Sequence, residues 1–249
     1  MSDAIPAATV VIFRERENGS PEVLMLERAK AMVFAAGALV FPGGRIDPGD
    51  EALAATMAGA PNDTAARIAA IRETIEETGL AIGLSTAPDH AALARIREGL
   101  HGGVPFAELL ADAGLRLALD ALTPFARWCP AHAHARIFDT RFYLARLPKD
   151  APTPRVDATE NVRLFWASAE AVLAEAAAGR ARIIFPTRRN LERLARFATF
   201  ADALADAARH PVRTITPWIE RRDGADHLCI DNDLGYPVTT EALDSAMRS

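Results

Sequence analysis

Three glutamates, Glu73, Glu76 and Glu77, occur at a spacing that gathers carboxylates. In an α-helix of about 100° per residue, Glu76 and Glu77 lie about 60° to one side and about 40° to the other side of Glu73. Their Cβ atoms are then about 5–6 Å apart, so the carboxylates can share a cluster of divalent cations. A solvated acidic face explains the same pattern, because water tolerates repulsion of about 0.2–0.5 kcal/mol per pair. The spacing makes this the first place to look for phosphate chemistry.

The surrounding residues predict the helix that positions these acids. Ile68, Ile71 and Ile75 fall on the side opposite the glutamates, so the helix has an apolar back and an acidic front. Any of the three polar residues that follow Pro61 can cap its start, and Gly79 is well placed to end it. We therefore expect an amphipathic helix that begins just after Pro61 and ends at Gly79.

Two further features flank the acids. Arg72 precedes Glu76 by four residues and can brace it. Upstream, residues 41–44 read Phe-Pro-Gly-Gly, which predicts a glycine-rich turn. With these features, residues 72–80 resemble the second half of the Nudix hydrolase box, G-x5-E-x7-R-E-U-x-E-E-x-G-U, in which U is a bulky apolar residue. Thr74 in a U position is a mild departure from that pattern.

The first half of the box is similar as well. Gly44 is followed after five residues by Asp50, where the family usually has Glu. Twenty-one residues then separate Asp50 from Arg72, although the pattern allows seven. Residues 51–64 are therefore interpreted as a small helical insertion in the loop before the helix. The role of Asp50 stays open, because Thr64 occupies the position at the seven-residue spacing.

Residues 24–44 resemble a stretch of the coenzyme A diphosphatase branch, L-L-T-x-R-[SA]-x3-R-x3-G-x3-F-P-G-G. Arg28, Gly37 and residues 41–44 match at the same spacings, whereas Leu26 replaces the Thr and Val33 replaces the second Arg. An insertion inside the box also resembles the branch that includes the peroxisomal coenzyme A diphosphatase. The stretch narrows the resemblance from the family to a branch.

Resemblance to this family implies an α/β/α sandwich around a mixed sheet, in a single domain over residues 1–249. Residues 86–115 are expected to form inserted helices, and residues 187–210 a C-terminal helical extension. Apolar and alternating runs predict strands at 8–13, 23–26, 38–41, 122–129, 137–147 and 162–166, and helices at 169–178 and 190–208.

The resemblance also implies a site. The three glutamates and the carbonyl of Gly44 would bind Mg²⁺ or Mn²⁺, which take oxygen ligands. Glu160, six residues before a tryptophan, is a further candidate ligand or general base, and Glu73 is the other candidate base. The predicted metal ligands are Gly44, Glu73, Glu76, Glu77 and Glu160, and the predicted catalytic residues are Arg72 and the same four glutamates.

Substrate anions need cationic partners, and the guanidinium fork of arginine suits phosphate oxygens. Arg28 is the first candidate because it falls in the coenzyme-A-like stretch. Arg188 and Arg189 stand at the start of a predicted helix, whose N-terminus favours an anion. Each arginine taken singly is also explained as an ordinary surface residue. The predicted substrate-binding residues are Arg28, Gly43, Gly44, Arg45, Arg141 and Arg188.

The expected reaction is hydrolysis of coenzyme A or acyl-coenzyme A to adenosine 3′,5′-bisphosphate and (acyl-)phosphopantetheine. A pyrophosphatase for ADP-ribose or NADH is the same-class alternative, but residues 94–97 lack its Pro or Tyr and no Ser-Gln-Pro-Trp run occurs. A Nudix-like ligand sensor without catalysis is the other alternative, yet the three box glutamates and Arg72 are all present. Zinc at Cys129, His132 and His134 is disfavoured, because Cys-x2-His-x-His lacks the spacing of a structural site.

Composition agrees with an enzyme of this kind. A chain of 249 residues, half of them hydrophobic, can bury a substantial core. The net charge of −5 argues against general nucleic-acid binding, and no apolar run reaches the ~18 residues of a membrane span. Two cysteines and the absence of a secretory signal pattern favour the cytoplasm. The expected partner is a small diphosphate substrate, and a homodimer is left open.

Overall fold

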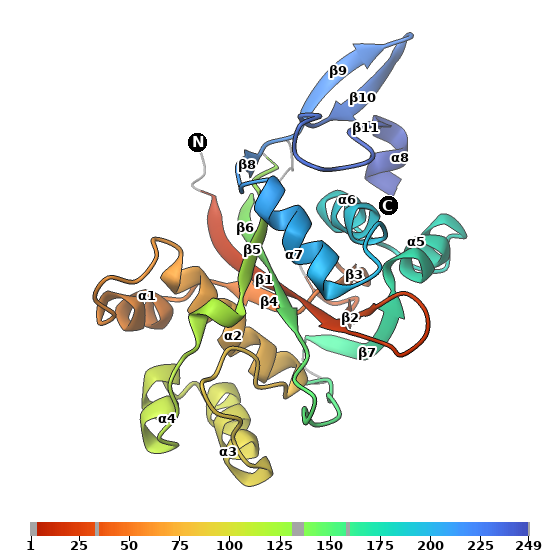
Figure 1. Cartoon of the computed structure of the whole chain (residues 1–249). Helices are drawn as coiled ribbons and strands as arrows, with labels where there is room; N and C mark the ends of the chain where they lie inside the picture. Colours follow the sequence, from red (N-terminus) through yellow and green to blue (C-terminus); the bar gives the residue numbers. More distant parts are fainter. Residues whose placement is uncertain (1–3, 33–34, 131–136, 158–159, 249) are drawn as a thin grey trace.

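The computed structural model describes residues 4–32, 35–130, 137–157 and 160–248, and within them a mixed sheet of eight strands lies between layers of helices (Figure 1). The strands of this sheet are β1 Ile5–Arg14, β2 Glu22–Arg28, β3 Leu39–Val40, β4 Gly43–Arg45, β5 Thr123–Trp128, β6 Phe138–Arg146, β7 Asn161–Ser168 and β8 Thr214–Ile215. Neighbouring strands follow the order β3-β2-β1-β6-β5-β8, while β4 pairs with β1 and β7 pairs with β2.

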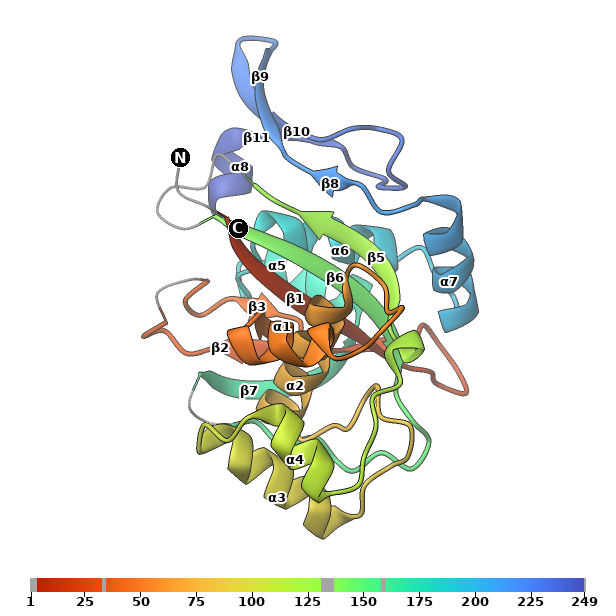
Figure 2. The same ribbon diagram turned by 90° about the vertical axis from the view of Figure 1, so that its left-hand side faces the viewer.

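Helices cover both faces of the sheet. They are α1 Pro48–Ala55, α2 Thr64–Thr78, α3 His90–His101, α4 Phe106–Asp112, α5 Ala169–Ala177, α6 Phe185–Leu194, α7 Phe200–Arg209 and α8 Leu243–Arg248, with a 3-10 turn at Leu119–Ala121. In Figure 2, α1 and α2 lie in front of the sheet and α5 and α6 lie behind it, with α3 and α4 below α2. The arrangement confirms the predicted α/β/α sandwich.

The sequence of β1 explains why both faces are covered. Successive side chains of a strand point to opposite faces. Val10 and Ile12 pack into the apolar cluster that contains α2, whereas Val11 and Phe13 pack into the cluster beneath α5 and α6. All four side chains are buried. β1 also pairs in parallel with β6 along nine residues, and parallel pairing is typical of sheets that are buried on both sides.

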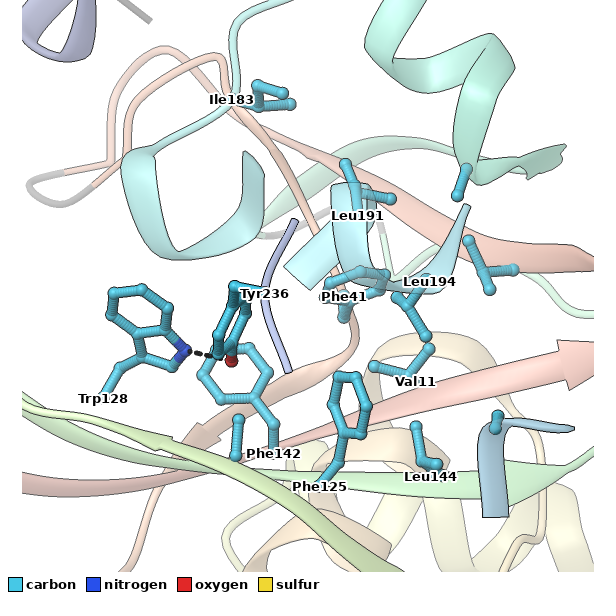
Figure 3. Close-up of a cluster of buried hydrophobic side chains, with 14 of the residues drawn as sticks. Val11, Phe41, Phe125, Trp128, Phe142, Leu144, Ile183, Leu191, Leu194 and Tyr236 are labelled. Atoms are coloured by element: carbon cyan, nitrogen blue, oxygen red, sulfur yellow. Dashed lines mark hydrogen bonds between the residues drawn. The ribbon is translucent and has the colours of Figure 1, made fainter. Parts of the chain in front are cut away.

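The cluster beneath α6 is rich in aromatic side chains (Figure 3). Trp128 lies edge-to-face with Tyr236, their ring centroids 5.5 Å apart, and its indole N–H donates to the Tyr236 hydroxyl at 3.2 Å. That hydroxyl donates in turn to Asn190 Oδ1 at 2.8 Å. The C-terminal segment that carries Tyr236 is thereby anchored to the sheet and to α6.

Most predicted elements are present, but the single helix expected at 190–208 is wrong. The structure has α6 and α7 instead, separated by residues 195–199. The reason is a reciprocal cap at the start of α7: Thr199 N–H donates to Asp202 Oδ2 at 2.9 Å, and Asp202 N–H donates to Thr199 Oγ1 at 3.1 Å. Such a capping box starts a new helix. The two helices predicted within 86–115 are α3 and α4.

A second sheet near the C-terminus was not predicted. It comprises β9 Trp218–Arg222, β10 Ala225–Cys229 and β11 Thr240–Ala242, and Figure 1 shows it extending away from the sandwich. Trp218 and Ile219 are exposed on it. Among the helices of the described residues, none combines the length and apolar character needed to cross a membrane.

Candidate active site

Helix α2 holds the three glutamates as its sequence predicted. Ile68, Ile71 and Ile75 are fully buried against the sheet, which directs the opposite side of the helix away from the core. The helix begins at Thr64, and Gly79 ends it in the left-handed conformation with φ of 68°. Asp63 is the N-cap residue but makes no capping side-chain bond, because it accepts from the hydroxyl of Tyr143 and from Arg67.

The glycine turn at residues 43–44 lies directly against these acids. Gly43 N–H donates to Glu77 Oε2 at 2.8 Å. Any Cβ at position 44 would overlap the carboxylate of Glu73, so only glycine leaves room for that carboxylate. The structure therefore brings Gly43, Gly44, Glu73 and Glu77 together from parts of the chain that are about thirty residues apart.

Arg72 organises the other side of the acidic cluster. Its side chain is buried and donates to Asp50 through Nε at 3.1 Å and Nη2 at 2.9 Å. Nη1 donates to Glu73 Oε1 at 3.0 Å and lies 3.5 Å from Glu76 Oε2. Burial disfavours the charged form of Arg72. The hydrogen bonds with Asp50 and the charge of Glu73 outweigh this effect and raise the pKa of the Arg72 guanidinium.

Two of the glutamates hold their protons unusually tightly. Burial raises the pKa of Glu73 from its ordinary 4.5 to about 7, against the opposing charge of Arg72. Burial together with the charge of Glu73 raises the pKa of Glu77 to about 8. Both shifts have the same physical origin, because carboxylates removed from water lose hydration that no nearby cation replaces in full.

Glu160 and Arg28 lie at the Glu77 end of the site. Arg28 Nη2 donates to Glu160 Oε2 at 3.2 Å, and its charge acts on Glu77. Arg28 is largely buried, whereas the Glu160 side chain is 56% exposed. The residue after it, Asn161, was missed by the sequence analysis: it is 1% exposed and donates through Nδ2 to Glu77 Oε1 at 2.9 Å. A polar residue at the start of a strand was the only signal for it.

The remaining predicted anion-binding residues are dispersed. Arg45 follows Gly44 directly with an exposed side chain, and its carbonyl accepts from Arg72 at 3.0 Å. Arg141 lines a separate cavity of about 240 Å³ whose lining includes none of the box glutamates. Arg188 lies in the first turn of α6 and is half-buried. Arg189 is buried, and its Nη2 donates to Glu192 at 2.9 Å and to Glu241 at 3.0 Å, so its role as an anion ligand stays a prediction.

The donor set fits a hard divalent cation, although the acids are not preassembled around one. Within the described residues, no group of three or more His, Cys, Asp or Glu side chains is arranged to hold a metal ion. Glu77 is held by backbone and amide donors, and Glu76 lies between Arg72 and His101, 3.7 Å from His101 Nδ1. Carboxylate oxygens retain a second lone pair in such bonds, and a cation would offset the loss of hydration and the repulsion that raise the pKa values of Glu73 and Glu77. His132 and His134 lie outside the described residues.

Three solved structures are compared with this chain. A NUDIX hydrolase from Alicyclobacillus acidocaldarius is 29% identical, with a TM-score of 0.69 over 82% of this chain and 97% of that one. A C. elegans Ap4A hydrolase binary complex is 17% identical over 81% of this chain and 93% of that one, with a TM-score of 0.39. The NUDIX domain of Shewanella oneidensis NrtR complexed with ADP ribose is 14% identical over 70% and 79%, with a TM-score of 0.39. No family model matches.

The sandwich, the acidic helix against the glycine turn and the first of these relatives define an enzyme that hydrolyses phosphoric anhydride bonds. The chain is similar to this Nudix hydrolase in fold and, at 29% identity, in sequence. Ahead of the predicted insertion at residues 51–64, α1 begins at Pro48 and places Asp50 against Arg72.

Proposed function

We propose that this Nudix hydrolase cleaves the diphosphate of coenzyme A or acyl-coenzyme A, with Mg²⁺ or Mn²⁺ as cofactor. The products would be adenosine 3′,5′-bisphosphate and (acyl-)phosphopantetheine. The observation that supports the substrate is the position of Arg28: the arginine of the coenzyme-A-like stretch lies beside Glu77 and Glu160. A guanidinium at this place suits a phosphate oxygen of the substrate.

The ligands proposed for the metal are Gly44 through its carbonyl, Glu73, Glu76, Glu77 and Glu160. When bound, the metal would neutralise the diphosphate and lower the pKa of a water molecule that attacks phosphorus. Arg72, held by Asp50, fixes the carboxylate of Glu73 against the glycine turn. Glu73 and Glu160 are the two candidates to accept the proton of that water. A carboxylate with a pKa near 7 is well matched to that task at neutral pH.

Other properties belong to the same proposal. We place the enzyme in the cytoplasm, as one catalytic domain over residues 1–249, with a small diphosphate compound as its partner. Neither nucleic acid nor a membrane is part of this proposal. Whether two chains associate as a homodimer is open to measurement of the molecular mass in solution.

A substrate panel tests the proposal. The protein is incubated with Mg²⁺ and, in separate reactions, coenzyme A, ADP-ribose, NADH and dinucleoside polyphosphates, and the products are read by mass spectrometry. We expect turnover of coenzyme A with the appearance of phosphopantetheine. Brisk turnover of another compound without turnover of coenzyme A or its thioesters would overturn the substrate. Binding of a ligand without turnover of any compound would favour a sensor.

A further inference from the structure

A cavity of about 390 Å³ lies at the C-terminal end of α2, between α3 and the segment that leads into β7. Leu93 and Ala94 of α3 form one wall, and Pro152 and Val156 form the other. Neither wall belongs to the Nudix box. The two walls of the cavity are therefore formed by residues outside the proposed catalytic site.

The walls are fixed to the box helix by one side chain. Arg97 donates through Nε to the carbonyl of Glu76 at 2.9 Å, and through Nη2 to those of Glu77 at 3.2 Å and Arg155 at 2.7 Å. Arg155 N–H donates in turn to the carbonyl of Thr78 at 2.8 Å. These bonds satisfy the last carbonyls of α2, which have no partner within the helix. The cavity thus has a set position relative to the acids.

His101 connects the cavity to the acidic cluster. It lines the cavity, and its Nδ1 lies 3.7 Å from Glu76 Oε1. A substrate whose diphosphate lies at Glu73 and Glu76 therefore has the cavity next to one of its two arms.

The diphosphate of coenzyme A joins two arms, a phosphate-bearing nucleotide and an uncharged arm that ends in a thiol or thioester. The residues that line the cavity suit one of these arms better than the other. Two arginines and two acids line the cavity, Arg97 and Arg155 with Glu98 and Asp157, so their formal charges balance. Arg97 already donates to three carbonyls, which leaves it a poor ligand for a phosphate. Apolar walls with a few polar groups suit an uncharged arm.

We propose that this cavity binds the uncharged amide-and-thiol or thioester arm of the substrate, leaving the phosphate-bearing nucleotide outside it. The inference rests on the proposed function, since it concerns the two arms of coenzyme A. It makes α3 and the segment at residues 152–156 determinants of specificity.

Two matched substitutions on α3 test the inference. Ala94 and Ala91 are both exposed, but only Ala94 lines the cavity. In Ala94→Trp the indole would occupy the cavity, and we expect the KM for coenzyme A to rise by about tenfold, the order of effect of losing a small apolar group from a pocket. Ala91→Trp should leave the KM unchanged. Ala94→Glu, a smaller change at the same wall, repeats the test should the tryptophan variant not fold.

Direct binding separates the two proposals. Titration of 4′-phosphopantetheine into each Mg²⁺-loaded protein, followed by calorimetry, should give about tenfold weaker binding to Ala94→Trp than to Ala91→Trp. Equal binding and equal KM in the two variants would overturn the cavity assignment while leaving the substrate intact. Absence of coenzyme A turnover by the wild-type protein would overturn the proposed function, and this inference with it.

Discussion

Asp50 of α1 and Arg72 of α2 form a buried ion pair across 22 positions of the chain. The Asp50 side chain is 1% exposed and accepts from Arg72 at both of its oxygens. Its Oδ2 also accepts the backbone N–H of Asp47 at 2.9 Å, which fixes it in the first turn of α1. Thr64, at the nominal box spacing, instead donates its hydroxyl to the carbonyl of Pro61. Asp50 therefore provides the carboxylate that balances the buried charge of Arg72.

Replacement of Asp50 by Asn should destabilise the protein strongly. Arg72 would remain buried without its counter-charge, and breaking a buried pair in this way costs about 3–5 kcal/mol. Asp47→Asn is the matched control: that carboxylate lies 3.4 Å from Arg72 but is 58% exposed, so its loss should cost less than about 1 kcal/mol. Urea denaturation of both variants measures the difference. Equal stability of the two would show that Arg72 does not depend on Asp50.

The pairing of Asp50 with Arg72 is a contact that the sequence alone did not predict. Six strands of the main sheet (β1, β2, β3, β5, β6 and β7), α2 and the pair α3–α4 follow from local periodicity, which acts over a few residues, and they were predicted. The partner of Arg72 depends on how twenty-one intervening residues fold back, and no local pattern encodes that. The same holds for Asn161, which reaches Glu77 across 84 positions. The break between α6 and α7 was encoded locally, in Thr199 and Asp202, and was overlooked.

The two adjacent glycines should respond differently to alanine. At Gly44 the added Cβ would meet only the end of the flexible Glu73 side chain, which can move aside. We expect Gly44→Ala to fold but to lose on the order of 10²-fold in kcat/KM, because a displacement of ~1 Å in a catalytic group has that effect. At Gly43 the φ of 152° disfavours any side chain, and the Cβ would lie 2.6 Å from Thr9 Cα.

Gly43→Ala should therefore lose stability by about 1–3 kcal/mol or more, since backbone must shift. Melting temperature and kinetics of both variants check this contrast. A Gly44→Ala enzyme with normal kcat/KM would mean that the position of the Glu73 carboxylate against the turn does not matter for turnover.

Glu76→Gln should abolish turnover and leave the fold intact. The side chain is 27% exposed, and its two ionic neighbours, Arg72 and His101, are 3.5 and 3.7 Å away, so folding depends little on its charge. The proposed metal site, in contrast, would lose one ligand. Glu51→Gln, on the exposed side of α1, serves as the control with unchanged activity. Circular dichroism and coenzyme A hydrolysis measure the two effects, and full activity of Glu76→Gln would remove this residue from the metal site.

The raised pKa values of Glu73 and Glu77 predict a pH dependence of stability. A carboxyl that titrates near 7 or 8 when folded and near 4.5 when unfolded binds more protons in the folded state throughout that interval. The free energy of unfolding therefore falls as the pH rises. Above about pH 9 the stabilisation contributed by these two carboxyl groups is fully lost. Each unit of pKa shift is worth about 1.4 kcal/mol, so the total is on the order of a few kcal/mol.

A metal ion should reverse this dependence, because it competes with the protons for the same carboxylates. In EDTA, the melting temperature should fall between pH 6 and pH 9. In Mn²⁺, the stabilisation relative to EDTA should grow over the same interval. Glu77→Gln removes the group with the higher pKa, so its melting temperature in EDTA should depend less on pH than that of the wild type. A wild-type protein whose response to Mn²⁺ is the same at pH 6 and pH 9 would show that these two carboxylates do not bind the ion.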